Sequence, residues 1–178
     1  MIAIVAVDEH YAIGHKGGML FHLPDDLKYF AAQTRGKTLV MGRKTLESFP
    51  GGKPLKGRPH IVFSRNPDYH PEGVTLVRSV KELEQAIRGL PGDEVMLCGG
   101  DSLYHLLIDC CDSALVTKIE AAAKQADSFF PNLDAKDNWE LANCRERQEQ
   151  NGLGFRFCEY VNKAVVPLNE IIAMEDKK

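Results

Sequence analysis

Basic residues and glycines stand at four points of the sequence where an apolar run ends. Gly42-Arg43-Lys44-Thr45 follows one run, Ser64-Arg65 follows a second, and Arg78 lies just past a third. Gly99-Gly100-Asp101-Ser102 follows a fourth, without the spacing of a GxGxxG or Walker motif. Glycines let the backbone approach a ligand closely, and open α/β sheets bind ligands at the carboxyl ends of strands. Together these groups predict a site for a polyphosphate or dinucleotide, with enough cations for a 2′-phosphate.

A second residue that could take part in binding or catalysis is Asp26, which lies in the first turn of a predicted helix. Its neighbours Leu27 and Phe30 are apolar. One interpretation is helix-start electrostatics, which Asp25 would serve equally well. The other is a carboxyl group in an apolar pocket, where burial would raise its pKa and a cationic ligand would lower it. The pattern alone leaves both open.

Alternating strands and helices must position these groups. Apolar runs predict strands at residues 2–7, 38–41, 60–63, 74–77, 94–98, 114–119, 139–142 and 155–160. Helical spacing and capping patterns predict helices from residue 24 and over 43–48, 79–88 and 102–108, and residues 50–59 predict a loop. We therefore expect an α/β fold with a central, mainly parallel eight-stranded sheet, an antiparallel C-terminal edge strand and helices on both faces.

Composition narrows the class of protein. The chain has 178 residues, which favours one domain, and its net charge of −3 argues against a dedicated nucleic-acid binder. Five cysteines without a CxxC pair predict buried, reduced thiols and a cytoplasmic protein. No signal peptide or membrane span is expected, and six histidines show no metal-binding spacing. Near the C-terminus, Leu168, Ile171 and Ile172 share helical spacing, which fits either an amphipathic turn or two or a frayed end.

The order of these motifs resembles that of dihydrofolate reductases. The residues that carry the resemblance are Leu23-Pro24-Asp25-Asp26-Leu27, Met41-Gly42-Arg43-Lys44-Thr45, Ser64-Arg65, and Gly99-Gly100 followed by Tyr104. Ala12-Ile13-Gly14, Thr117 and Phe130-Pro131 also fit. The resemblance implies one dihydrofolate reductase-like domain over residues 1–162 and a separate tail at 163–178. It further implies a cytoplasmic, monomeric antifolate target that serves one-carbon metabolism, with no nucleic-acid or membrane partner.

The implied reaction is the NADPH-dependent reduction of 7,8-dihydrofolate to 5,6,7,8-tetrahydrofolate, by hydride transfer to pterin C6 and protonation at N5. Asp26 resembles the catalytic carboxylate that binds the pterin, and Thr117 would hydrogen-bond to it from an adjacent strand. Water is the implied proton carrier. Arg58 resembles the arginine that clamps the glutamate carboxylate of the substrate, a geometry that arginine suits. The other implied substrate-binding residues are Ile4, Val5, Phe21, Leu27, Phe30, Phe49, Leu55, Cys98 and Tyr104.

The resemblance implies NADPH as the cofactor and no metal. Ser64, Arg65 and Arg43 would hold the 2′-phosphate, with help from Arg78. Gly99-Gly100 would carry a cis peptide, and residues 15–19 would form a mobile loop with Asp127 as a candidate partner. The remaining implied cofactor-binding residues are Ala6, Ile13, Gly14, Gly18, Met19, Gly42, Lys44, Thr45, Gly99, Gly100, Asp101, Ser102, Leu103 and Tyr104.

Two departures from the family pattern concern the site. Leu20-Phe21 stands where Pro-Trp is usual, and Phe21 cannot donate a hydrogen bond. Asp101 replaces a small residue, and we expect its side chain to cap the following helix. Two alternatives stay open. A riboflavin-pathway reductase on the same fold would lack the helix start that carries Asp26. A non-catalytic nucleotide-binding module would not oxidise NADPH.

Overall fold

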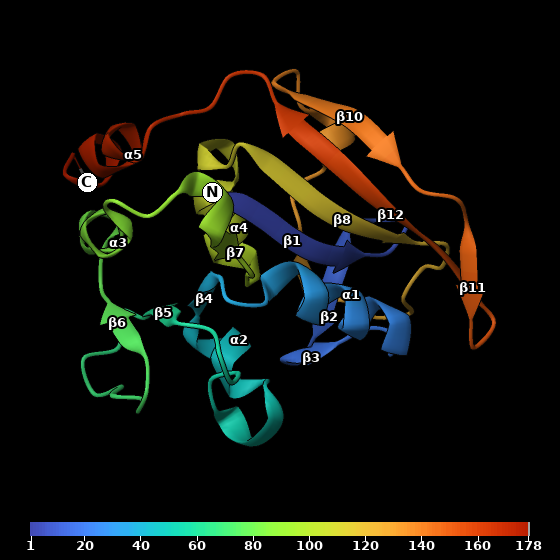
Figure 1. Ribbon diagram of the computed structural model, residues 1–178, viewed down its shortest axis with the longest axis horizontal. Coiled ribbons are helices and arrows are strands. Elements are labelled where there is room, and N and C mark those ends of the chain that lie inside the picture. The colour runs from blue at the N-terminus through green and yellow to red at the C-terminus, as the bar shows by residue number, and fades with distance from the viewer. Residues whose placement is uncertain (178) are drawn as a thin grey trace.

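A sheet built around the N-terminal strand forms the centre of the computed structural model, which describes residues 1–177 (Figure 1). Eight strands lie in the order β10-β12-β8-β1-β7-β4-β5-β6, and a ninth, β11, pairs with β12. The strands are β1 (Ile2–Val7), β4 (Thr38–Gly42), β5 (His60–Phe63), β6 (Thr75–Val77), β7 (Val95–Leu97), β8 (Ser113–Ile119), β10 (Trp139–Cys144), β11 (Gln148–Gln150) and β12 (Leu153–Asn162). All eight predicted strands are present.

Strand β1 lies at the middle of the sheet and pairs in parallel on both sides. Ile2 pairs with Met96 of β7 and with Ser113 of β8. The sheet stays parallel from β8 through to β6. The expected antiparallel edge is formed by the last two long strands, because β12 runs antiparallel to β8 and β10 pairs antiparallel to β12.

Helices cover both faces of the sheet, as predicted. Helices α3 (Val80–Ile87) and α4 (Asp101–Leu107) pack over one face, and α1 (Pro24–Thr34) and α2 (Arg43–Glu47) over the other. Successive side chains of a strand point to opposite faces of the sheet, so each strand contributes residues to the core on both faces. Val40 and Leu97 therefore join the core under α3 and α4, whereas Leu39 and Met96 join the core under α1 and α2.

A second sheet of three short strands was not predicted. It consists of β2 (Ala12–His15), β3 (Gly18–Met19) and β9 (Ser128–Phe129), in the order β3-β2-β9. The buried carboxylate of Asp8 shapes the turn that leads into it. This carboxylate accepts hydrogen bonds from the backbone N–H groups of His10, Ala12 and Ala123, at 2.8, 2.9 and 2.8 Å.

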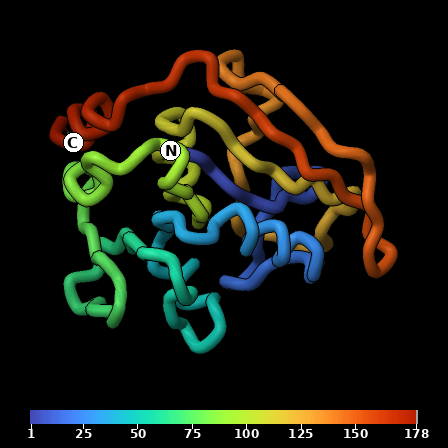
Figure 2. Tube along the Cα trace, viewed as in Figure 1, coloured from blue at the N-terminus to red at the C-terminus, as the bar shows by residue number. Residues whose placement is uncertain are grey.

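The C-terminal residues form helix α5 (Leu168–Glu175), which lies beside α3 (Figure 2). Leu168, Ile171 and Ile172 pack against the core under α3 and α4. The helical spacing therefore belongs to an amphipathic helix rather than to a frayed end. The chain reaches this position from the end of β12, after passing the end of the sheet at which β1 and β8 begin (Figure 1).

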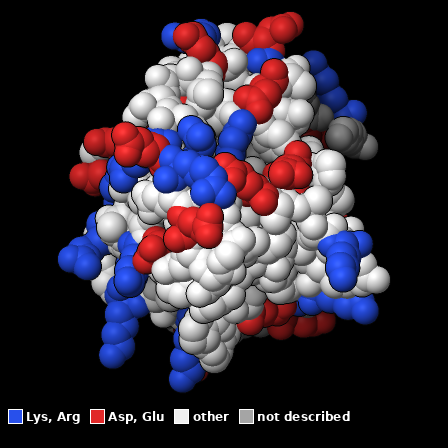
Figure 3. All heavy atoms as spheres, turned by 90° about the vertical axis from the view of Figure 1, so that its right-hand side faces the viewer, with Lys and Arg blue, Asp and Glu red and all other residues white. Residues whose placement is uncertain are grey.

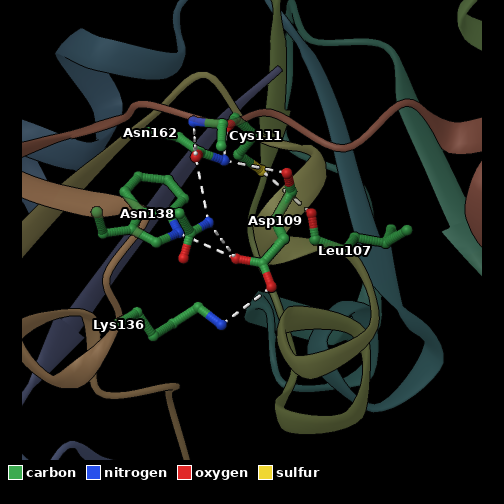
Figure 4. Close-up of polar contacts among 8 residues, drawn as sticks. Leu107, Asp109, Cys111, Lys136, Asn138 and Asn162 are labelled. Carbon is green, nitrogen blue, oxygen red and sulfur yellow. Dashed lines mark hydrogen bonds and ion pairs between the residues drawn. The ribbon is translucent and has the colours of Figure 1, made fainter.

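A polar network around Asp109 fixes the path of the chain as it leaves β12 (Figure 4). The Asp109 carboxylate accepts hydrogen bonds from Asn138 Nδ2 at 2.9 Å, Lys136 Nζ at 2.9 Å and Trp139 Nε1 at 3.1 Å. Burial pushes the pKa of Asp109 upward, but these hydrogen bonds outweigh it and hold the pKa below its usual value. The Asp109 carbonyl also accepts hydrogen bonds from Asn162 Nδ2 at 3.0 Å and the Val166 N–H at 2.8 Å, which ties the tail to the domain.

The prediction that all cysteines are reduced was wrong for two of them. Cys144 of β10 and Cys158 of β12 face each other in the antiparallel register and form a disulfide. Cys98, Cys110 and Cys111 are free thiols.

Basic and acidic side chains are interleaved on the face around β11 (Figure 3). Arg147 pairs with Glu120 at 2.6 Å and with Glu149 at 3.1 Å, and Arg156 lies 4.0 Å from Glu120. Within residues 1–177, no helix is long and apolar enough to cross a membrane.

Candidate active site

Asp26 and Thr117 meet between α1 and the sheet, as the sequence predicted. Pro24 opens α1 and places Asp26 in its first turn, and Thr117 lies next to Ala6 in the parallel register of β8 and β1. The Thr117 hydroxyl donates a hydrogen bond of 2.6 Å to Asp26 Oδ1, and Thr117 is only 2% exposed. Burial raises the pKa of Asp26, and the hydrogen bond from Thr117 opposes that rise. A partly buried carboxylate that accepts a hydrogen bond from one neutral donor is suited to bind a ligand that carries N–H groups.

The apolar residues predicted to bind the substrate fall mainly into two core clusters. Ile4, Phe30, Phe49, Leu55 and Cys98 belong to the core cluster under α1 and α2. A separate cluster contains Phe21 with Ala6 and Leu23, and Leu27 on α1 is 40% exposed.

Two other predicted substrate residues, Val5 and Tyr104, are placed differently. The Val5 side chain packs into the core on the opposite face of the sheet. Tyr104 is buried and its hydroxyl donates to the Ile4 carbonyl at 2.6 Å. Burial raises the pKa of the Cys98 thiol, which therefore stays protonated.

Arg58 lies at the C-terminal end of α1, where its guanidinium is held on three sides. Nε donates to Thr34 Oγ1 at 3.0 Å, Nη2 donates to the Ala31 carbonyl at 3.1 Å, and Nη1 donates to the Lys56 carbonyl at 3.1 Å. A guanidinium has five N–H donors, so one donor on each terminal nitrogen is left for a ligand. That arrangement is suited to a carboxylate bound through both oxygens.

The turns that follow β4 and β7 meet at the carboxyl ends of these strands. The Gly42 N–H donates to the Gly99 carbonyl at 2.7 Å, and the Gly99-Gly100 peptide is cis, as expected. A Cβ atom on Gly99 would lie 2.8 Å from the Tyr104 ring, and one on Gly100 would lie 3.3 Å from Thr45 Oγ1. Glycines are therefore required for these turns to meet, and their backbone is left bare for a phosphate-bearing ligand.

The predicted phosphate-binding cations are arranged unequally around these turns. Lys44 is exposed on α2, and Arg43 pairs with Glu47 at 3.0 Å and lies over the Tyr69 ring. Arg65 is 77% exposed and follows buried Ser64 at the end of β5.

Arg78 is occupied by the neighbouring loop. Its guanidinium donates to four backbone carbonyls, those of Ser64, Asn66, Pro67 and Tyr69. The structure therefore uses Arg78 to shape the loop beside Arg65, rather than leaving its donors free for a ligand.

The expected cap by Asp101 was wrong. No side chain caps the N-terminus of α4. Asp101 instead accepts a hydrogen bond from the Phe129 N–H at 2.9 Å and lies 3.1 Å from His105 Nδ1. It therefore joins α4 to the small sheet. Ser102 follows on α4, and Leu103 is buried in the core, so its side chain is turned away from the turns.

The loop between β2 and β3 is fastened by Asp127, its expected partner. The Lys16 N–H donates to Asp127 Oδ2 at 2.7 Å, and the Asp127 N–H donates to the Gly14 carbonyl at 3.0 Å. The Lys16 hydrogen bond is the largest of the influences that lower the pKa of Asp127. Ile13 and Gly14 lie on β2, and Gly18 and Met19 form exposed β3 at the rim of the site.

Two residues beside the basic turns were not anticipated from the sequence. Tyr69 stacks on Arg43, and Glu175 of α5 lies 3.7 Å from Arg65. The first lies in an irregular loop, and the second lies in the tail, about 110 residues away along the chain. Neither has a local sequence signal.

The sheet ends thus form two neighbouring halves, one apolar with a buried carboxylate and one basic with bare glycine turns. Such a pair defines an α/β enzyme that brings a ring-bearing substrate next to a phosphorylated cofactor.

Comparison with known proteins gives the family. The family model described as dihydrofolate reductase matches residues 1–162. Dihydrofolate reductases of Staphylococcus aureus and Neisseria gonorrhoeae are 36% and 35% identical over 162 residues, covering 90% of this chain and 96% of each relative. A solved dihydrofolate reductase from Enterococcus faecalis, complexed with NADP(H) and RAB-propyl, has a TM-score of 0.80 and 34% identity, covering 90% of this chain and 95% of that one.

The chain therefore belongs to the dihydrofolate reductase family. It is an oxidoreductase, and the reaction of the family is the NADPH-dependent reduction of 7,8-dihydrofolate to 5,6,7,8-tetrahydrofolate. The family match decides against the riboflavin-pathway alternative.

Proposed function

We propose that this chain carries out the family reaction with Asp26 as the residue that binds and polarises the pterin. The observation that carries this assignment is the partly buried Asp26 carboxylate, which accepts a hydrogen bond from Thr117 and whose pKa is raised by burial. The remaining acceptor positions of the carboxylate match the N3–H and 2-amino groups of a pterin. A negative charge held in an apolar pocket also favours a substrate that is protonated at N5.

NADPH supplies the hydride that pterin C6 accepts. Around it, the protein has to bind phosphates, hold the two rings together and exclude water. Arg43, Lys44 and Arg65 supply positive charge, and the turns at Gly42 and Gly99-Gly100 supply bare backbone, so this half of the site fits a phosphorylated dinucleotide.

The rest of the substrate fits the apolar half of the site. Phe30, Phe49 and Leu55 offer apolar walls for the p-aminobenzoyl group. The two free donors of Arg58 would bind the α-carboxylate of the glutamate. The His15–Met19 loop, fastened through Asp127, would cover the reacting rings. Because Phe21 has no donor, water that carries the proton to N5 would be held by other groups.

We further propose that the chain acts as a monomer in the cytoplasm, without nucleic-acid or membrane partners. A single chain supplies every candidate site residue. Free thiols at Cys98, Cys110 and Cys111 fit a reducing compartment, although the Cys144–Cys158 disulfide departs from that pattern.

The decisive assay follows NADPH absorbance with dihydrofolate as substrate, comparing the wild type with Asp26→Asn. We expect turnover to fall about 100-fold or more at neutral and high pH, where the lost charge matters most for N5 protonation. The loss should shrink at low pH, where the substrate is protonated by the solvent. No NADPH oxidation by the folded wild type would exclude the function. An unchanged pH–rate profile in Asp26→Asn would exclude the role of Asp26.

A further inference from the structure

The C-terminal tail carries an acidic group to the edge of the basic half of the site. Helix α5 is held beside α3 by Leu168, Ile171 and Ile172, and its approach is fixed by the hydrogen bond from the Val166 N–H to the Asp109 carbonyl. The matched family segment ends at residue 162. The tail is therefore an addition to the family fold with a defined position.

This acidic group is Glu175, the last residue of α5. Its Oε1 lies 3.7 Å from Arg65 Nη2, and its Oε2 accepts a hydrogen bond from the Val80 N–H at 3.4 Å. The Glu175 side chain is 29% exposed, whereas the Arg65 side chain is 77% exposed. Arg65 is thus reachable by a ligand, and a carboxylate already lies at its guanidinium.

The neighbouring cations do not relieve this competition. Arg78 donates to the carbonyls of the adjacent loop, and Arg43 pairs with Glu47. A 2′-phosphate at Ser64 and Arg65 would therefore meet the negative charge of Glu175 at the same guanidinium. A cofactor with a 2′-hydroxyl would meet no such repulsion, and a carboxylate is a good acceptor for a ribose hydroxyl.

We propose that Glu175 is a specificity-determining residue that competes with the cofactor 2′-phosphate for Arg65 and so narrows the preference for NADPH over NADH. This role depends on the proposed 2′-phosphate site at Ser64 and Arg65. Since the Arg65 side chain is largely solvent-exposed and the two charges lie 3.7 Å apart, the competition is modest. Removing the charge should tighten NADPH binding about two- to fivefold, the range of an exposed ion pair.

The test is the dissociation constant of NADPH and of NADH for the apoprotein, measured by fluorescence titration at low salt for wild type and Glu175→Gln. We expect tighter NADPH binding, with NADH binding unchanged or weaker. Glu170→Gln is the matched control, because it removes the same charge from the first turn of the same helix. The gain should vanish near 1 M salt, where charges are screened beyond about 3 Å.

Arg65→Ala separates failure of this role from failure of the site assignment. If Arg65→Ala weakens NADPH but not NADH, while Glu175→Gln has no effect or changes both cofactors equally, Glu175 is not a competitor. If Arg65→Ala leaves the NADPH-to-NADH ratio unchanged, the 2′-phosphate lies elsewhere and both ideas fall. If Arg65 binds the 2′-phosphate and Glu175 competes for it, Glu175→Gln should leave NADPH binding unchanged in the Arg65→Ala background. Dihydrofolate turnover, measured separately, reports on the reaction itself.

Discussion

Replacing Thr117 by valine should raise the pKa of Asp26. The two side chains are joined by a hydrogen bond of 2.6 Å, in which the Thr117 hydroxyl donates to the carboxylate. Burial already raises this pKa, and the hydrogen bond is the influence that works against burial. Valine keeps the shape of threonine but removes the donor, so the charged form of Asp26 becomes less stable relative to the protonated form.

The size of the shift follows from the strength of the lost bond. A hydrogen bond to a charged group contributes about 1.5–3 kcal/mol, and one pKa unit corresponds to about 1.4 kcal/mol. The charged form of Asp26 should therefore be destabilised by about 1.5–3 kcal/mol in Thr117→Val, and its pKa should rise. The ionised fraction at mildly acidic pH falls accordingly, and dihydrofolate affinity should fall with it.

Carbon-13 NMR of the Asp26 side-chain carboxyl, followed through a pH titration without ligands, measures this shift directly. Thr38→Val makes the same chemical change on β4 and is the control. An Asp26 midpoint that stays in place or moves down in Thr117→Val would refute the reasoning. Rescue by Thr117→Ser, which restores the hydroxyl, should return the midpoint toward the wild-type value.

Two more predictions concern stability and the substrate tail. Asp26→Asn should stabilise the fold. In the wild type, the raised pKa of Asp26 contributes stability that is fully present below the ordinary pKa of 3.8 and is lost as pH rises through the higher folded-state pKa. Asparagine does not titrate, so the variant does not lose this stability. The gain in Tm by calorimetry should grow from pH 4 toward neutrality, and a gain independent of pH would contradict it. Arg58→Ala should raise KM for dihydrofolate about 10- to 100-fold, but leave KM for dihydropteroate, which lacks the glutamate, nearly unchanged. An equal rise for both substrates would mean that Arg58 acts only by supporting α1.

Local patterns were sufficient for the main sheet but not for the small one. The eight predicted strands are apolar runs long enough for their period to be read. Strands β3 and β9 have two residues each, and β3 begins at Gly18, so neither has a period. The same limit hid the disulfide, because the pairing of Cys144 with Cys158 depends on a register that shifts between Leu141 and Asn143.

At the site, the family motifs placed Asp26 and Thr117 correctly relative to each other. They could not give the surroundings of the charged residues. Arg78 is a cation in the sequence, but the loop that follows Ser64 folds so that its carbonyls take the guanidinium donors. Glu175 meets Arg65 only because α5 packs on α3. Both outcomes depend on tertiary packing, which single residues do not encode.

The central position of β1 also has a consequence for the order in which the chain folds. Ile2 is made well before its partners, Met96 and Ser113. At about 5–20 residues per second, roughly 5–20 s pass during synthesis before both partners exist. Until the first of these partners, β7, has been made, β1 has no strand of the sheet to pair with. Contacts so distant in sequence also slow folding from the full-length chain. The strand at the centre of the finished sheet is therefore made long before the two strands that flank it.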